Sequence, residues 1–165
     1  MNRNLGLVLD DIDWKILQEL QANARTAFAE LGRRVGLSTP AVAERVRRME
    51  DAGVILGYHA QIDPAKVGLP MQAFIRVNVA GDKLTKFAAL VQECPEVLEC
   101  HRVTGSESFI IKVAVSDNTH LEHVIDSLMP YVATTTSMIL SSPLTWSAVK
   151  PKSKEAIAAG IARGF

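Results

Sequence analysis

The chain of 165 residues has few cysteines and no net charge, and both absences limit what the protein can be. Its two cysteines, Cys94 and Cys100, are too few for the disulfide framework of a small secreted domain and favour a reducing compartment. Eighteen Lys and Arg residues balance eighteen Asp and Glu residues. The whole molecule is therefore not a generic polycation that binds nucleic acid through its total charge.

Long hydrophobic runs and catalytic motifs are also missing. No apolar stretch approaches the ~20 residues that a membrane-spanning helix needs, and the N-terminus lacks the residue order of a signal peptide. Neither a phosphate-binding loop nor a G-x-S-x-G nucleophile motif occurs, and Cys94, Cys100 and His101 match no zinc-ligand spacing. We expect a cytoplasmic protein that is not an enzyme, with no cofactor, no metal site and no membrane partner.

The first third of the chain has the hydrophobic spacing of short helices. Apolar residues recur every three or four positions through residues 9–20, after which residues 28–48 predict two more helices that reverse at Gly36. Ser38 or Thr39 can cap the start of the last helix. This order is typical of a helix-turn-helix, which places its last helix in the major groove of double-stranded DNA.

Arginines gather on the last two of these helices: Arg33, Arg34, Arg45, Arg47 and Arg48. Phosphate oxygens need such a positive field, and an Arg fork can also grip a guanine edge. Because residues 1–65 hold eight Lys or Arg and nine Asp or Glu, the positive charge is a patch on a neutral domain. An arginine run alone would favour a solvated surface, but its occurrence with the turn and the cap favours DNA binding.

Helical spacing predicts which side of the last helix contacts DNA. Val42, Val46 and Met49 recur at i, i+4 and i+7 and should face inward. The opposite side presents Pro40, Glu44, Arg47 and Arg48. Replacing Arg47 or Arg48 should therefore weaken DNA binding without unfolding the protein.

From Met71 onward the hydrophobic period changes from helical to alternating. A short strand over 53–62 should lead away from the helices, and the Pro and Gly content of 63–70 indicates a hinge. Beyond it we expect strands and helices in the order βαββαβ, at 71–79, 83–93, 97–104, 109–115, 119–129 and 134–142.

The predicted fold class is α+β, with a winged-helix-like helix-turn-helix domain followed by a ferredoxin-like domain. The segments are a DNA-binding domain at 9–62, a hinge at 63–70, an effector and assembly domain at 71–150, and a tail at 151–165. Two helices should cover one face of the sheet, while the other face carries Phe74, Ile110 and Ala114 among polar residues. A face that its own helices leave open usually finds a partner, so we expect self-association through it.

The chain resembles the Lrp/AsnC (leucine-responsive, feast/famine) transcription factors from Leu9 to Pro151. The matching segments are LDDIDWKILQEL, ARTAFAELGRRVGLS, ERVRRMEDAGVILGYHAQIDP and VLECHRVTG. The resemblance implies dimers that often gather into octamers, and a small-molecule effector such as an amino acid bound where dimers meet. It also implies a recognition helix at 38–49, with DNA contacts from Ser38, Thr39, Arg45, Arg47 and Arg48. Two such helices in a dimer would read half-sites about one DNA turn (~34 Å) apart in a near-palindromic operator.

The effector site implied by the resemblance departs from the family pattern. It would comprise Gly105, Ser106, Glu107 and Ser108, next to Thr135, Thr136 and Ser137. Similar proteins commonly read Gly-Asp-x-Asp-Tyr in this loop, whereas this chain has serine at both Asp positions and its carboxylate one residue away. The site could bind another ligand or none, so an architectural DNA-binding protein without an effector is the alternative. A siroheme decarboxylase-like enzyme shares the two-domain layout but is much less favoured.

Overall fold

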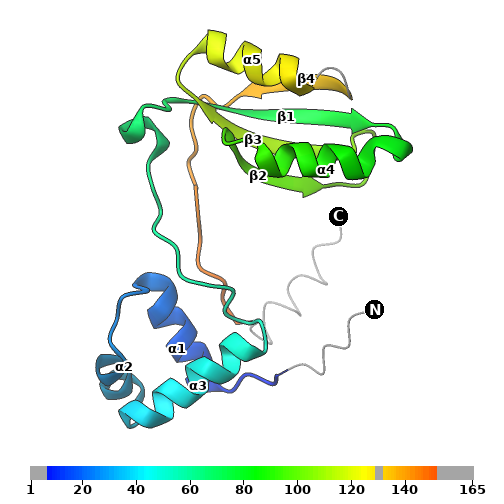
Figure 1. Ribbon diagram of the computed structural model, residues 1–165. Coiled ribbons are helices and arrows are strands. Elements are labelled where there is room, and N and C mark those ends of the chain that lie inside the picture. The colour runs from blue at the N-terminus through cyan, green and yellow to red at the C-terminus, as the bar shows by residue number, and fades with distance from the viewer. Residues whose placement is uncertain (1–6, 129–131, 152–165) are drawn as a thin grey trace, which may run out of the picture. The chain divides into compact units, whose positions relative to one another are not determined.

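The computed structural model describes residues 7–128 and 132–151 and divides into two units (Figure 1). Of the described residues, unit 1 holds 7–60 together with 144–151, and unit 2 spans Gln61–Pro143. None of the described helices is long and apolar enough to cross a membrane.

The described part of unit 1 contains three helices, α1 (Asp11–Ala22), α2 (Phe28–Val35) and α3 (Thr39–Asp51). Asp10 caps α1 by accepting a hydrogen bond from the backbone N–H of Asp13, whose own carboxylate accepts from the N–H of Asp10. Gly36 reverses the chain after α2 with a left-handed φ of 74°, which only glycine adopts without strain. The predicted three helices and their tight turn are confirmed.

The core of unit 1 forms where the apolar stripes of the three helices meet. Its buried members are Ile16, Leu17, Leu20, Leu31, Val42, Val46 and Met49. The inward stripe predicted for the last helix is therefore confirmed.

The predicted strand at 53–62 is wrong. The N–H groups of Val54 and Ile55 both donate to the carbonyl of Met49, which holds the start of the segment against the end of α3. The remainder is extended, but no strand of the described chain pairs with it. The β-branched and apolar residues of this segment favour a strand, but the segment forms no strand because no neighbouring strand supplies backbone hydrogen bonds.

Unit 2 is a four-stranded antiparallel sheet with two helices. The elements are β1 (Met71–Val79), α4 (Leu84–Glu93), β2 (Val97–Arg102), β3 (Phe109–Val115), α5 (Asn118–Leu128) and β4 (Val132–Met138). The strand order β2-β3-β1-β4 confirms the βαββαβ ferredoxin-like topology (Figure 1). The last strand begins and ends earlier than the predicted 134–142.

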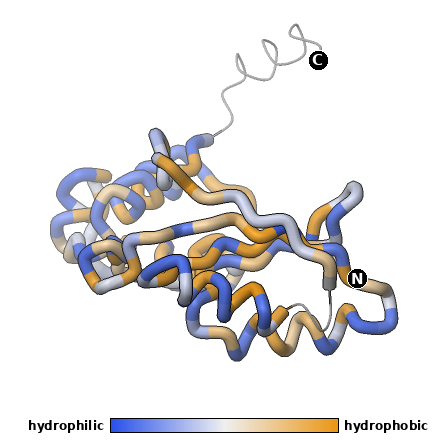
Figure 2. The backbone as a smooth tube through the Cα atoms, turned by 90° about the horizontal axis from the view of Figure 1, so that it is seen from above, coloured by the Kyte–Doolittle hydropathy of each residue, from blue (hydrophilic) through white to orange (hydrophobic). Residues whose placement is uncertain are grey.

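The two faces of this sheet differ. Alternate residues of β1 and β3 are buried with Phe87, Val91, Leu121 and Val124 from the helices, and the tube in Figure 2 shows the alternation along the strands. The other face exposes Phe74 and half-exposes Ile110. Ala114, opposite Gln72, shares this face by register but is fully buried, so it adds nothing to the exposed apolar surface.

The residues after β4 are divided differently from the sequence prediction, which assigned 71–150 to one domain. Leu144–Pro151 belong to unit 1, where the side-chain amide of Gln21 donates to the carbonyl of Val149 (3.0 Å) and accepts from its N–H (2.7 Å). The predicted hinge contains a 3₁₀ helix, Pro64–Val67, closed by Gly68 at φ 89°. The predicted tail lies outside the described residues except for Pro151.

Candidate nucleic-acid interface and effector site

The start of α3 presents its first turn to solvent. Ser38 is the cap, and its hydroxyl accepts a hydrogen bond from the N–H of Ala41 (3.4 Å). Thr39 and Pro40 follow in the first turn, and all three of Ser38, Thr39 and Pro40 are exposed. This is the end of a recognition helix that usually contacts base edges.

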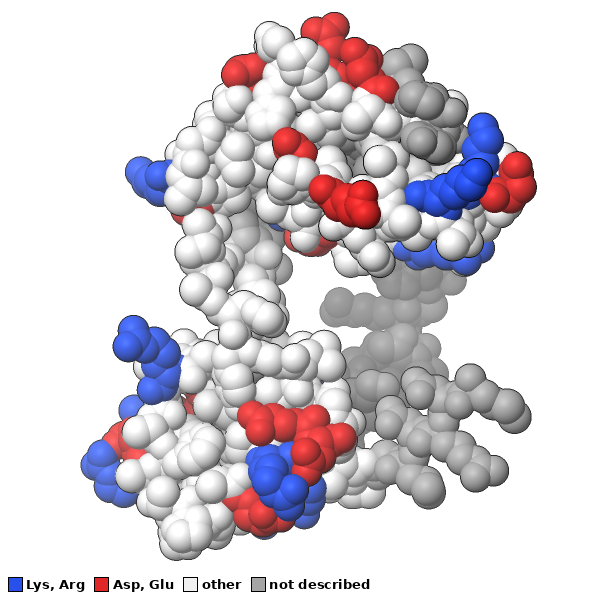
Figure 3. Space-filling model, viewed as in Figure 1, with Lys and Arg blue, Asp and Glu red and all other residues white. Residues whose placement is uncertain are grey.

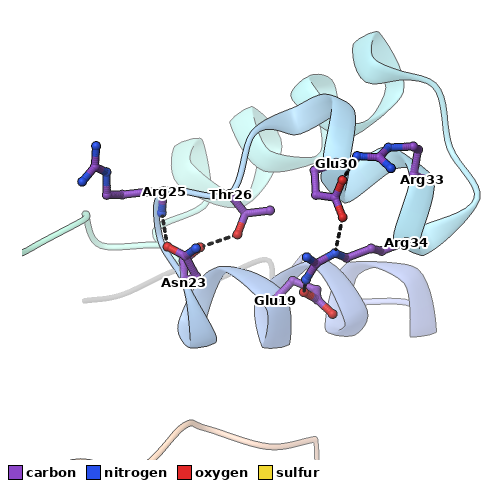
Figure 4. Close-up of polar contacts among 7 residues, drawn as sticks. All are labelled: Glu19, Asn23, Arg25, Thr26, Glu30, Arg33 and Arg34. Atoms are coloured by element: carbon purple, nitrogen blue, oxygen red, sulfur yellow. Dashed lines mark hydrogen bonds and ion pairs between the residues drawn. The ribbon is translucent and has the colours of Figure 1, made fainter.

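Every arginine in the predicted patch forms an ion pair within unit 1. On α2, Glu30 accepts from Arg33 and from Nε of Arg34 (2.7 Å), and Arg34 also reaches Glu19 of α1 (Figure 4). Figure 3 shows acidic and basic side chains side by side on this unit. Any DNA contact of these arginines therefore has to compete with carboxylates.

Arg47 lies on the outer side of α3, as the helical spacing predicts. It binds Glu44 (2.9 Å) and Asp51 (2.7 Å) on its own helix, and its side chain is 62% exposed. Its hydrogen bond to Glu44 lowers the pKa of that carboxyl and raises its own pKa. Exposed pairs of this kind contribute little to stability because solvent screens them, so a phosphate could replace the carboxylates at little cost.

Arg48 and Arg45 behave differently, because both reach back to α1. Nη2 of Arg48 donates to Oδ2 of Asp13 (2.9 Å), and Nη1 of Arg45 donates to Oδ1 of Asp13 (2.7 Å) and to Asp10 (2.8 Å). The carboxylate of Asp13 is fully buried. Arg47 and Arg48 both lie outside the apolar core, as predicted, and the side chain of Arg48 is 45% exposed although its guanidinium reaches back to the buried carboxylate on α1.

The Asp10 carboxylate completes this group. The backbone N–H of Asp13 and, next, the guanidinium of Arg45 lower the pKa of Asp10 below its usual value. Hydrogen bonds from Arg45 to Asp10 and Asp13 raise the pKa of Arg45. Sequence reasoning missed Asp13, although its position three residues after the Asp10 cap is the signal of a reciprocal cap.

The loop between β2 and β3 contains the predicted effector residues. Gly105 has φ 122°, a conformation that favours glycine. The Ser106 hydroxyl donates to the carboxylate of Glu107 (2.7 Å). The Ser108 hydroxyl accepts from the N–H of Val79 (3.1 Å) and donates to its carbonyl (3.3 Å), so this serine ties the loop to the end of β1.

A shallow depression of about 330 Å³ opens on the uncovered face of the sheet, lined by Phe74, Arg76, Ile110 and Ser137. Nη2 of Arg76 donates to the hydroxyl of Ser137 (3.4 Å). The charge of Arg76 also lowers the pKa of Glu107, after the larger effects of hydrogen bonds from Ser106 and from its own backbone N–H. Arg76 thus bonds Ser137 of β4 and acts through its charge on Glu107 of the loop. Sequence reasoning did not include Arg76 in the site, although strand alternation places it on this face.

Strand register separates the three predicted residues of β4. Thr135 lies opposite Arg76 and Ser137 opposite Phe74, so both share the open face. Thr136 lies opposite the buried Ile75, on the helix-covered face. Grouping Thr136 with the other two is therefore corrected, because successive residues of a strand point to opposite faces.

Two family models match the chain: the AsnC-type helix-turn-helix domain over residues 9–50 and the Lrp/AsnC ligand binding domain over residues 72–148. YezC of Bacillus subtilis, described as an uncharacterized HTH-type transcriptional regulator, is 43% identical over 134 residues, which are 81% of this chain and 95% of YezC. The chain belongs to the Lrp/AsnC family. It is a DNA-binding transcriptional regulator with a ligand-binding domain.

Solved Lrp/AsnC structures share this fold. The structure of Bacillus subtilis LrpC has a TM-score of 0.81 and 33% identity, covering 85% of this chain and all of that one. A transcriptional regulator from Neisseria meningitidis in complex with L-methionine has a TM-score of 0.80 and 36% identity, covering 86% and 96% of the two chains. YezC, LrpC and the Neisseria protein are named as transcriptional regulators, and none of the three is named as an enzyme.

Proposed function

We propose that this Lrp/AsnC regulator binds a near-palindromic DNA operator as a dimer or larger assembly, with α3 as recognition helix and a small molecule adjusting its binding. The observation that carries the proposal is the exposed first turn of α3 together with Arg33 and Arg47, whose side chains are mostly exposed. Ser38, Thr39 and Pro40 face the bases, while Arg33 and Arg47 serve the phosphates. Glu44 and Arg34 flank these contacts.

The ion pairs of the exposed arginines support an exchange of partners on DNA. The side chains of Arg33 and Arg47 are 78% and 62% exposed, and each pairs with a carboxylate one turn away on its own helix. A phosphate offers the same acceptor geometry and releases condensed counterions when it is neutralised. Arg33 and Arg47 can therefore exchange their carboxylate partners for DNA phosphates with little loss of folded-state stability.

Arg47→Ala should weaken DNA binding at all sequences and make it less dependent on salt. Each lost phosphate contact reduces the slope of log K against log [salt] by about 0.9. Fluorescence anisotropy of a labelled duplex, titrated at several salt concentrations, gives this slope. The matched control is Arg25→Ala, which removes the same charge from the exposed turn after α1. A wild-type slope in the Arg47 variant would contradict the assignment.

The open face of the ferredoxin-like unit supplies the groups that an amino acid requires. Among the residues that line the depression, the Arg76 guanidinium suits a carboxylate, and Phe74 with Ile110 offers an apolar wall. Glu107 of the loop between β2 and β3, which is affected by the charge of Arg76, suits an ammonium group. A second copy of the chain on this face would enclose the shallow depression between two sheets. The methionine complex of the Neisseria relative supports a ligand of this class.

A thermal-shift screen with the twenty amino acids tests the effector site. A ligand at 100 times its Kd adds about 2.7 kcal/mol to the folded state and raises the midpoint of unfolding. Arg76→Ala should abolish the shift, whereas Lys112→Ala removes a charge from the same sheet face outside the depression and should preserve it. A shift that survives in the Arg76 variant would place the ligand elsewhere.

An architectural protein without an effector is the second candidate function. The favouring observation is that the loop is already satisfied internally, since Ser108 bonds the backbone of Val79 and Ser106 bonds Glu107. In that case no amino acid changes the unfolding midpoint or the DNA affinity, while the salt-dependent DNA binding persists.

A further inference from the structure

The carboxylate of Asp13 joins the beginning of α1 to two successive turns of α3. Oδ1 accepts from Arg45 (2.7 Å), and Oδ2 accepts from Arg48 (2.9 Å) and from the backbone N–H of Asp10 (3.2 Å). Among the residues that the structure describes, it is the one polar or charged residue that is buried, with an exposed fraction of 0%. Every other buried side chain of unit 1 is apolar.

Apolar contacts and this ion-pair group restrain α3 in different ways. The packing of Ile16, Leu17 and Leu20 against Val42, Val46 and Met49 resists separation of the helices, but dispersion and apolar burial have little directionality. Hydrogen bonds from two planar guanidinium groups to one carboxylate are directional and short. They fix where α3 lies along α1 and how it is rotated about its own axis.

We infer that Asp13 is a positioning residue for DNA recognition, which sets the rotation and axial place of α3 through Arg45 and Arg48. This inference rests on the proposed function of α3. Asp13 cannot touch DNA itself because its side chain is buried, whereas the side chains of Arg45 and Arg48 are 25% and 45% exposed while both guanidinium groups bind Asp13. Arg45 and Arg48 therefore serve first as the α3 half of this connection, and Arg47 and Arg33 carry the phosphate contacts.

Loss of the Asp13 charge should separate specific from non-specific binding. Asp13→Asn removes one negative charge beside two arginines, so the local positive field grows and non-specific affinity stays equal or rises. Base readout depends on α3 being held in its docking geometry, and one well-made base contact is worth about tenfold or more in discrimination. Specific affinity should therefore fall while non-specific affinity does not.

The experiment compares two duplexes, one selected by the wild-type protein from a random library and one scrambled to the same composition. In Asp13→Asn the ratio of specific to non-specific affinity should fall about tenfold, with a salt slope no smaller than that of the wild-type protein. Arg48→Lys keeps the charge and loses the planar fork, so its ratio should fall in the same direction if Asp13→Asn does not fold. Arg47→Ala provides the contrast, because it lowers both affinities and the slope together.

The outcomes separate this inference from the proposed function. A role in stability alone would reduce both affinities by the same factor, and a preserved ratio in the Asp13 and Arg48 variants overturns the positioning role. Failure of the wild-type protein to enrich any sequence, or binding that ignores salt, overturns the proposed function of α3 itself.

Discussion

Gly32→Val should unfold the three-helix unit or leave it strongly destabilised. Gly32 is buried in the middle of α2, and a Cβ added there would lie 2.5 Å from the carbonyl oxygen of Leu37. The backbone at Leu37 cannot move away easily, because the N–H groups of Gly36 and Leu37 both donate hydrogen bonds to the carbonyl of Gly32. Valine adds two further methyl groups in the same space, and overpacking of this kind costs about 1–3 kcal/mol or more.

Tryptophan fluorescence can follow this unit by itself. Both tryptophans of the chain, Trp14 and Trp146, belong to unit 1. Ala29→Val is the matched control, since it places the same side chain on the exposed side of the same helix and should cost less than about 0.7 kcal/mol. If Gly32→Val has the same urea midpoint as the control, the turn after α2 can shift to accommodate the valine, and the predicted destabilisation is contradicted.

Phe87→Ala should destabilise unit 2 by about 3–5 kcal/mol, the usual cost of removing a buried aromatic side chain. Phe87 lies on α4 with no exposed surface, and its ring meets that of Phe109 at a centroid distance of 5.0 Å and an angle of 41°. Its loss opens a cavity between the helices and the sheet and removes this tilted ring contact.

Far-UV circular dichroism with urea should show the loss in the transition of unit 2, while the tryptophan signal of unit 1 keeps its own midpoint. Phe28→Ala is the control, because Phe28 is 38% exposed on α2 and should cost much less. An unchanged sheet transition in Phe87→Ala would contradict its central place in the core of unit 2.

Periodicity predicts most of the fold because each element satisfies a local rule. The stripe of Val42, Val46 and Met49 and the alternation of β1 needed no tertiary information. The failed strand at 53–62 shows the limit of such rules, since a strand forms only with a neighbour that the sequence pattern does not supply. The grouping of Thr136 with Thr135 and Ser137 on one face fails for another reason, because alternation along β4 already places Thr136 on the opposite face.

The candidate site was harder to predict than the fold. The sequence located the arginines of α2 and α3 but not their partners, because Asp13 precedes Arg45 by 32 residues and meets it only in the folded unit. Arg76 and Glu107 are likewise far apart in the sequence, and the charge of Arg76 acts on Glu107 only in the folded sheet. Charge along the chain thus predicts where cations gather, while burial of one carboxylate determines which of them remain available.

The return of residues 144–151 to the helical unit has a consequence for how the protein is organised. The side-chain amide of Gln21 bonds both the carbonyl and the N–H of Val149, as a neighbouring strand would. Along the sequence, the ferredoxin-like unit therefore lies between two stretches of one helical unit. The polypeptide joins the two units twice, and a single proteolytic nick at one junction leaves the other covalent link intact. A label attached at Pro151 would consequently report on the helical unit, although Pro151 follows the ligand-binding domain in the sequence.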